Sequence, residues 1–188
     1  MPIYLIRHGQ SEFNAAFRAG EPDPMIFDAP LTELGVAQAK AARVAVQKLG
    51  IQTVIASPLT RALQTAQHIF GETHDINVRA GPHELLTHSC DVGRSMQQLQ
   101  GEFPQLSFDH VADLWWHQGA PNQFGYCVEP QGIFARRVHA FVATLTDFTD
   151  RPIAVVGHGN TFRELVGYDM ENCEIARFPL GEFVQQPG

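Results

Sequence analysis

Short runs of consecutive apolar residues alternate along this chain with longer stretches in which apolar residues recur every three or four positions. The short runs are typical of strands buried on both faces of a parallel sheet, and the longer stretches are typical of helices that cover such a sheet. We expect strands at residues 3–6, 53–57, 76–80 and 153–156. The alternation predicts an α/β fold, a three-layer α/β/α sandwich around a mostly parallel central sheet.

Two long helices are predicted on either side of the second strand. Thr32 caps the first helix and Gly50 ends it. Ser57 supplies the N-cap of the second helix and Pro58 its first position, and this helix runs to about residue 70. The apolar stripe of the first helix consists of Leu34, Ala37, Ala41, Val44 and Leu49.

The second half of the chain begins with residues 81–130, which lack clear periodicity. We expect an excursion from the sheet there, with one short helix near 94–103 and a packed aromatic cluster at 114–116. No linker or repeat interrupts the chain, so residues 1–188 are expected to form a single domain. A long helix is predicted from Gln131 and a shorter one over about 161–167. The long helix has an apolar stripe of Phe134, Val138, Phe141, Leu145 and Phe148.

Composition narrows the class of protein by exclusion. The net charge of -7, with only 13 lysines and arginines, leaves no basic face for a nucleic acid or an anionic membrane. No apolar run approaches the ~18 residues of a membrane span, and no signal peptide is recognisable. The three cysteines are far apart in the chain. We therefore expect a cytoplasmic protein without a disulfide framework.

Candidate chemistry lies where the predicted strands end. The segments LIRHG (residues 5–9) and VVGHG (residues 155–159) each close a strand with glycine and histidine, and Arg61 follows a third strand. Ligands of open parallel sheets bind beyond the carboxyl ends of the strands, so these side chains converge if the strands are neighbours. Two guanidiniums, two imidazoles and nearby helix N-termini would form an anion site. The expected ligand is phosphate.

The chain shows no motif for a metal ion or a nucleotide at this point. It has no Gly-x-x-x-x-Gly-Lys loop, and His83, His88 and Cys90 have a spacing that fits no familiar zinc motif. We therefore expect no metal and no cofactor. A neutral imidazole can attack phosphorus and carry the phosphoryl group covalently, and on these grounds either His8 or His158 can serve.

The segments RHGQSEFN, SPLTRALQTA and GHGNTFREL, in this order, resemble the histidine phosphatase superfamily, which is also called the phosphoglycerate mutase-like family. DAPLTELGVAQA and HSCDVG resemble segments of its short bacterial members. The resemblance implies the phosphoglycerate mutase-like α/β fold. It makes His8 the nucleophile, with Arg7 and Arg61 on the phosphoryl oxygens and His158 stabilising the transferred group. The matched motifs also imply substrate binding by Gln10, Ser11, Asn14, Gly159 and Asn160.

The resemblance further implies a carboxylic acid after the third strand, which protonates the leaving oxygen. Glu84 lies where this acid is expected, and Asp91 is the alternative. Apolar neighbours of Glu84 would raise the pKa of its carboxyl and so favour proton donation near neutral pH. Arg18 and Arg94 lie in loops where they could bind a second anionic group of the substrate. A solvated surface position is the favoured interpretation for both.

Three functions agree with this sequence. We favour a metal-independent phosphomonoester hydrolase that acts through a phosphohistidine on His8 and takes a small phosphorylated substrate. A phosphoglycerate mutase-type transferase is the first alternative, but dedicated mutases of this family are longer than this chain. The second alternative is a phospho-ligand binding module without catalysis. The chain is expected to be a monomer or a homodimer, and the excursion at 81–130 is expected to shape the substrate pocket.

Overall fold

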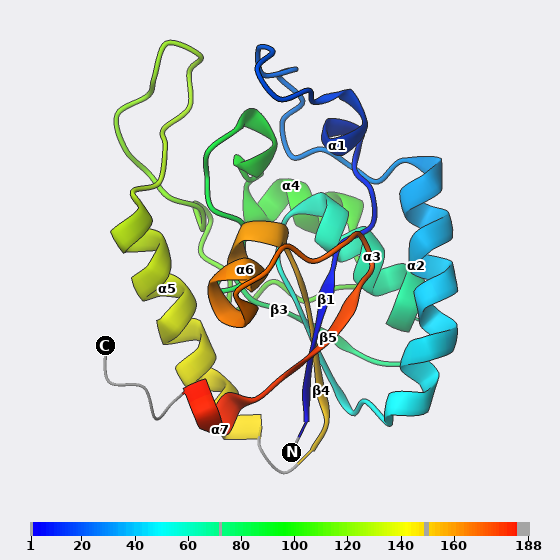
Figure 1. Cartoon of the computed structure of the whole chain (residues 1–188). Coiled ribbons are helices and arrows are strands. Elements are labelled where there is room, and N and C mark those ends of the chain that lie inside the picture. Colours follow the sequence, from blue (N-terminus) through cyan, green and yellow to red (C-terminus); the bar gives the residue numbers. More distant parts are fainter. Residues whose placement is uncertain (1, 72, 149–150, 184–188) are drawn as a thin grey trace.

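A computed structural model describes residues 2–71, 73–148 and 151–183 (Figure 1). Its central sheet has the strand order β3-β2-β4-β1-β5. Four strands are parallel to one another, and β5 runs antiparallel beside β1 at one edge. The α/β fold with a mostly parallel sheet is therefore confirmed. The strands are β1 (Ile3–Arg7), β2 (Thr53–Ala56), β3 (Ile76–Val78), β4 (Ile153–Gly157) and β5 (Ile175–Phe178).

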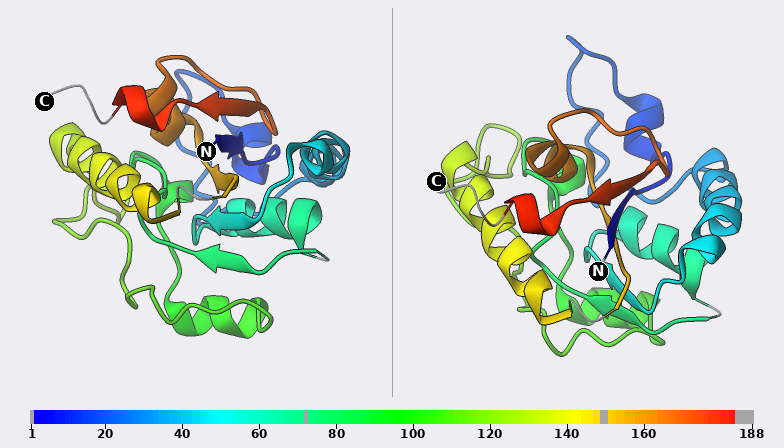
Figure 2. Two further views of the ribbon diagram at one scale, coloured as in Figure 1. Left: turned by 90° about the horizontal axis from the view of Figure 1, so that it is seen from below. Right: turned by 60° about the horizontal axis from the view of Figure 1, so that its bottom comes forward.

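Helices cover both faces of this sheet, which gives the predicted three layers (Figure 2). One face carries α2 (Glu33–Val46), α3 (Thr60–Phe70) and α4 (Met96–Glu102). The other face carries α5 (Gln131–Thr144) and α6 (Gly159–Val166). The shorter elements are α1 (Glu12–Ala16), η1 (Gln47–Leu49), η2 (Ser89–Asp91), η3 (Leu145–Phe148) and α7 (Leu180–Phe183).

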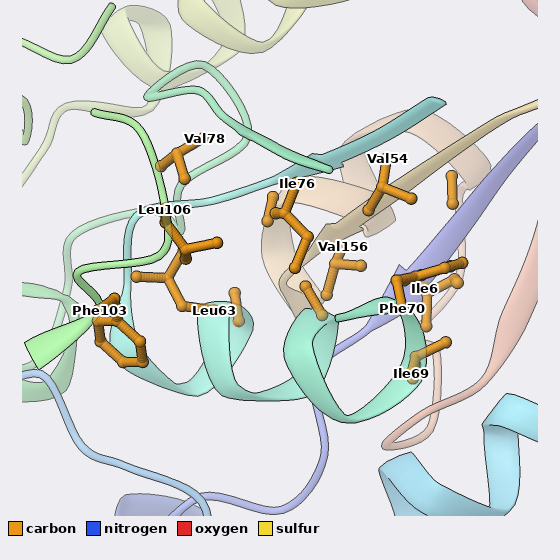
Figure 3. Close-up of a cluster of buried hydrophobic side chains, with 14 of the residues drawn as sticks. Ile6, Val54, Leu63, Ile69, Phe70, Ile76, Val78, Phe103, Leu106 and Val156 are labelled. Carbon is orange, nitrogen blue, oxygen red and sulfur yellow. The ribbon is translucent and has the colours of Figure 1, made fainter. Parts of the chain in front are cut away.

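Alternation along the strands divides the core into two clusters, because successive strand residues point to opposite faces. On one face, Ile6 and Val156 pack in the same cluster as Leu63 and Phe70 of α3 (Figure 3). The opposite face packs on α5 and α6, and its cluster includes Leu5, Ile55, Phe141, Val155 and Phe162. Trp115 belongs to the first cluster, so the aromatic segment of the excursion packs against the core as expected.

The predicted helix over residues 32–50 is confirmed, but of the five residues in its predicted apolar stripe only Leu49 packs against the core. Thr32 caps α2 by accepting the N–H of Gly35, and Gly50 ends the following turn with a φ of 63°. Leu34 and Val44 of the predicted stripe are 53% and 62% exposed. The buried positions are Gly35, Ala39 and Val46. The helix approaches its neighbours so closely that small residues, rather than large apolar ones, form the contact.

The start of α3 also differs from the prediction. Leu59 is its N-cap and offers no side-chain acceptor, so Ser57 does not cap the helix. A carboxylate distant in sequence takes that role, because Asp28 accepts the backbone N–H of Thr60 at 2.8 Å and its hydroxyl at 2.5 Å. At the other end of the chain, α6 begins at Gly159 rather than near residue 161.

Several short elements depart from the sequence-based expectations. β3 ends at Val78, before the predicted limit at residue 80, whereas the short helix expected near 94–103 is confirmed as α4. The prediction missed β5 and α1, which have four and five residues. Runs of this length carry too little periodicity to identify. Within the described ranges, no helix is long and apolar enough to cross a membrane.

The turn after β1 lies directly against the first turn of α2. A Cβ atom on Gly9 would lie 2.5 Å from the carbonyl oxygen of Gly35, and one on Gly35 would lie 2.1 Å from that of Gln10. Both obstructing atoms belong to the backbone, so a side chain at either position forces the two segments apart. Gly9 therefore sets the position of the neighbouring His8.

We expect Gly9→Ala to lower the free energy of unfolding by about 1–3 kcal/mol, the usual cost of overpacking. The measurement is urea denaturation, and Gly101→Ala is the matched control. A Cβ on Gly101 meets no atom within 4 Å, and this glycine lies in α4, so alanine there should stabilise the helix by up to about 1 kcal/mol. Equal stability of the Gly9 variant and the wild type would contradict the close approach.

Candidate active site

Strand register brings the two histidine turns together. β1 and β4 are adjacent and parallel, and Arg7 at the end of β1 pairs with Gly157 at the end of β4. His8 and His158 follow these paired residues, and their ring centroids are 5.2 Å apart. Both imidazoles are buried. The structure thus brings the two predicted histidines to one point beyond the carboxyl ends of the strands.

A cavity of about 310 Å³ opens at this end of the sheet. Most of the predicted site residues line it, whereas His158 is not in the lining and its ring lies beside that of His8. Gln10 does not line it, because its side chain accepts the hydroxyl of Thr32 at 2.9 Å. The predicted residues in the lining are Arg7, His8, Ser11, Asn14, Arg61, Glu84, Gly159 and Asn160.

His8 is held in one tautomer by its own turn. Its Nδ1 lies 2.7 Å from the carbonyl oxygen of Gly9, which can only accept, so Nδ1 carries the proton and Nε2 carries the lone pair. Arg61 donates its Nε–H toward this Nε2 over 3.3 Å. Burial, followed by the charges of Arg61 and Arg7, lowers the pKa of His8 well below the ordinary histidine value. The imidazole is therefore neutral at pH 7.

Arg61 is a buried guanidinium fixed on its far side. Its Nη1 donates to the carbonyl oxygen of Cys90 at 2.6 Å, and its Nη2 donates to Asp91 at 2.9 Å. The second oxygen of Asp91 accepts the backbone N–H groups of Thr87 and His88. Asp91 is thus committed to orienting Arg61, which leaves the Nε edge of the guanidinium directed at His8.

Arg7 provides the second positive charge. Its Nη1 donates to the carbonyl oxygen of Met170, and its buried Nε has no hydrogen-bond partner among the described residues. A Cβ on Gly159 would lie 3.5 Å from this Nε, so the absence of a side chain at Gly159 keeps that face of the guanidinium open. An anion in the cavity would satisfy the buried N–H group.

His158 is oriented by a residue that the sequence predicted for another role. Its Nε2 lies 2.8 Å from the Ser57 hydroxyl, and its buried Nδ1 has no partner in the part of the chain that the structure describes. Burial, followed by the charge of Arg61 and the proximity of His8, lowers the pKa of His158 well below its ordinary value. The second imidazole is therefore also uncharged and offers a hydrogen bond rather than a full charge.

Glu84 differs from Asp91 in what holds its carboxyl group. Backbone N–H groups of Leu85, Asn160 and Thr161 donate to it at 2.9, 3.0 and 3.1 Å. Burial, followed by the nearby charge of Asp91, raises the pKa of Glu84. Of the two candidate acids, Glu84 is thus the one whose pKa is raised, whereas Asp91 is ion-paired with Arg61.

The remaining predicted residues have mixed positions. Ser11 and Asn14 cap α1 reciprocally, since each side chain accepts the backbone N–H of the other, and both line the cavity. Arg94 does not reach the cavity, because it is paired with Asp28 and Glu102. Arg18 donates to backbone carbonyls within its own turn.

Several residues of the site were missed by the sequence-based prediction. Thr65 accepts the N–H of Gly9 at 3.1 Å, and its position four residues after Arg61 on α3 was a signal that it shares the same helix face. The sequence did not indicate that Asp169 lies at the cavity. In the described ranges, no group of three His, Cys, Asp or Glu side chains is placed to hold a metal ion. The lining also contains Asp91, which was the alternative acid, and Phe13, Thr87, His88, Cys90 and Asp169.

Comparison with known proteins gives the context of this geometry. The chain is 27% identical over 177 residues to the adenosylcobalamin/alpha-ribazole phosphatase of Salmonella typhimurium strain LT2, a match that covers 88% of this chain and 78% of that protein. A match of 41% identity to the Probable phosphoglycerate mutase GpmB of Proteus mirabilis covers only 37% of this chain and 30% of that protein.

A solved structure shows the same fold over most of the chain. Phosphoserine phosphatase of Entamoeba histolytica, in complex with 3-phosphoglyceric acid, superposes with a TM-score of 0.62 at 20% identity, covering 95% of this chain and 90% of that one. The model of the histidine phosphatase superfamily (branch 1) matches residues 3–182, which include the RHG turn, the Arg61 helix and the GHG turn. This chain belongs to the histidine phosphatase superfamily, branch 1.

Proposed function

We propose that this protein is a phosphomonoester phosphatase in which His8 becomes transiently phosphorylated without help from a metal ion. The observation that carries the proposal is the state of the His8 ring. Its Nδ1 proton is engaged by Gly9, so the unprotonated Nε2 is the nucleophilic nitrogen, and its lone pair can attack once the substrate phosphate takes over the Nε–H of Arg61. A buried neutral imidazole with one fixed lone pair is suited to nucleophilic attack.

The first step transfers the phosphoryl group from the substrate to His8. Nε2 of His8 forms a bond to phosphorus while the bond from phosphorus to the ester oxygen breaks. Arg7 and Arg61 neutralise the charge on the equatorial oxygens, and His158, whose ring lies beside that of His8, stabilises the transferred group. These charges are fixed before the substrate arrives, because Asp91 and the carbonyl oxygen of Met170 hold the guanidiniums in place.

Glu84 serves both steps as the proton donor and acceptor. Its protonated carboxyl gives a proton to the leaving oxygen, which departs as an alcohol. The resulting carboxylate then takes a proton from water as that water attacks phosphorus, which breaks the bond to Nε2 and releases inorganic phosphate. The phosphate dianion of the substrate adds negative charge beside Glu84, so binding favours its protonated form further.

Two observations favour a phosphatase over a mutase. A curated relative that matches most of this chain is a phosphatase, whereas the match to a probable phosphoglycerate mutase covers a minor part of both chains. The cavity is also open to solvent through Asn14, Asn160 and Asp169, which gives water a route to the phosphohistidine. A mutase must exclude water from this intermediate.

The proposal is tested by trapping the phosphoenzyme. A chromogenic aryl phosphate in excess EDTA should give a burst of aryl alcohol followed by steady turnover, because a covalent intermediate forms and decays. Alkaline quenching preserves phosphohistidine, and peptide mass spectrometry should place the phosphate on His8. Loss of activity in EDTA that a divalent metal ion restores would contradict the metal-independent mechanism.

A further inference from the structure

Beside the segment 81–86, which carries Glu84, lies a buried ion pair that does not line the cavity and that the proposed mechanism does not use. The carboxylate of Glu129 is 1% exposed and the side chain of Arg137 is 18% exposed. Arg137 donates from Nε to one oxygen of Glu129 at 3.1 Å and from Nη2 to the other at 2.8 Å. This two-point contact fixes the plane of the guanidinium.

The remaining N–H groups of Arg137 face the segment that carries Glu84. Nη1 donates to the carbonyl oxygens of Gly81 at 2.8 Å and His83 at 3.0 Å, and Nη2 approaches that of Glu84 at 3.4 Å. Glu129 reinforces the contact, because its backbone N–H donates to the carbonyl oxygen of Leu86 at 2.8 Å. The irregular segment 81–86 is therefore attached to the middle of α5 through Arg137 and to the residue before its N-cap through Glu129.

The opposite side of the same segment is attached to α6. Thr161 donates its hydroxyl to the carbonyl oxygen of His83 at 2.7 Å, while the Glu84 carboxyl receives the N–H groups of Asn160 and Thr161. Contacts with α6 hold the carboxyl group, and contacts with Arg137 hold the backbone that carries it. A segment without secondary structure of its own is thus fixed from both sides.

The geometry points to Arg137 and Glu129 as positioning residues that hold Glu84 at the distance and angle needed for proton transfer. This inference rests on the proposed function, in which Glu84 is the acid. Neither residue lines the cavity, so neither is expected to touch the substrate. A proton donor displaced by about 1 Å can cost a hundredfold in rate, so the pair controls activity from a distance.

Arg137→Lys is the informative substitution, because lysine keeps the positive charge beside the buried Glu129 but lacks the planar fork that reaches the carbonyl oxygens at the same time. We expect kcat/KM for alkyl phosphates to fall about tenfold to a hundredfold. For aryl phosphates, whose leaving groups need no proton, we expect a fall of less than about threefold. Arg136→Lys, at the exposed neighbouring position on α5, is the matched control and should change neither value.

A double-mutant comparison separates positioning from a general loss of structure. In the Glu84→Gln background, Arg137→Lys should add no further loss on alkyl phosphates, because the group that it positions is already absent. Additive losses, or equal losses on alkyl and aryl substrates, would overturn the inference while leaving the proposed function intact. If Glu84→Gln lowers kcat/KM equally for alkyl and aryl phosphates, the assignment of the acid fails, and the positioning role fails with it.

Glu129→Gln provides a second route if the lysine variant does not fold. It removes the buried carboxylate charge but leaves an amide oxygen that can accept a hydrogen bond from Arg137. We expect kcat/KM to fall more for alkyl than for aryl phosphates, as in Arg137→Lys, but by a smaller factor. Thermal unfolding of each variant is recorded alongside the kinetics. A well-folded Glu129→Gln protein with unchanged kcat/KM on both substrate classes would also overturn the inference.

Discussion

His8→Ala is expected to lower phosphatase activity by about 10⁴-fold or more, the scale seen when a covalent catalyst loses its nucleophile. The physical reason is specific, because His8 is the residue whose unprotonated Nε2 is fixed beside the guanidinium of Arg61. The measurement is kcat/KM for an aryl phosphate, together with the yield of trapped phosphoenzyme. Both should disappear, since attack by water would have to replace attack by imidazole.

The same variant separates catalysis from binding. Arg7 and Arg61 remain in place, so inorganic phosphate should still bind to His8→Ala, as measured by calorimetry. His110→Ala, at an exposed position outside this cavity, is the control and should retain activity. Turnover by His8→Ala close to that of the wild type would remove His8 as the nucleophile. A wild-type protein that binds phosphate but turns over no ester would identify the chain as a binding module.

Glu84→Gln is expected to lower kcat/KM for alkyl phosphates by about 10²–10⁴-fold, the usual contribution of a general acid. Aryl phosphates should be affected far less in kcat/KM, which reports the steps up to phosphorylation of His8. Their steady-state kcat can still fall, because water attack on the phosphohistidine needs the same carboxylate as a base. Equal losses in kcat/KM for both substrate classes would move the acid to another residue.

The pH profile supplies an independent check on this role. Proton donation requires protonated Glu84, whose pKa is raised by burial and by Asp91, so activity on alkyl phosphates should fall as the pH rises through that elevated pKa. Nucleophilic attack requires neutral His8, whose pKa is lowered, so protonation of this ring reduces activity only well below the ordinary histidine range. The basic limb should vanish from the residual activity of Glu84→Gln, whereas the acidic limb should stay.

Periodicity along the chain was sufficient to predict the layers of this fold. The strands β1, β2 and β4 are largely apolar runs, and α5 buries Phe134, Val138 and Phe141 as its pattern indicated. Burial on both faces of a strand and on one face of a helix is a direct consequence of side-chain direction. The motifs at the strand ends also predicted where the site lies, because parallel strands have their carboxyl ends at the same edge of the sheet.

Close packing decided what periodicity could not. The pattern assigned Leu34 and Val44 to the buried face of α2, but Gly35 occupies it, since the helix lies against the backbone of Gln10. Where the neighbouring backbone leaves room only for glycine on the buried face of a helix, larger apolar side chains of that helix can remain exposed to solvent. No property of α2 by itself contains that information, because the obstructing atoms belong to a turn about 25 residues earlier in the chain.

Long-range polar contacts likewise existed only in the tertiary structure. From the sequence alone, Ser57 was a helix cap and Asp91 a possible acid, and Arg137 was not singled out. Folding places Ser57 against His158, Asp91 against Arg61 and Arg137 behind Glu84. The sequence by itself determined the kind of fold and the central residues of the site. The tertiary structure decided which groups orient them, because hydrogen-bond partners far apart in the chain depend on how the segments pack.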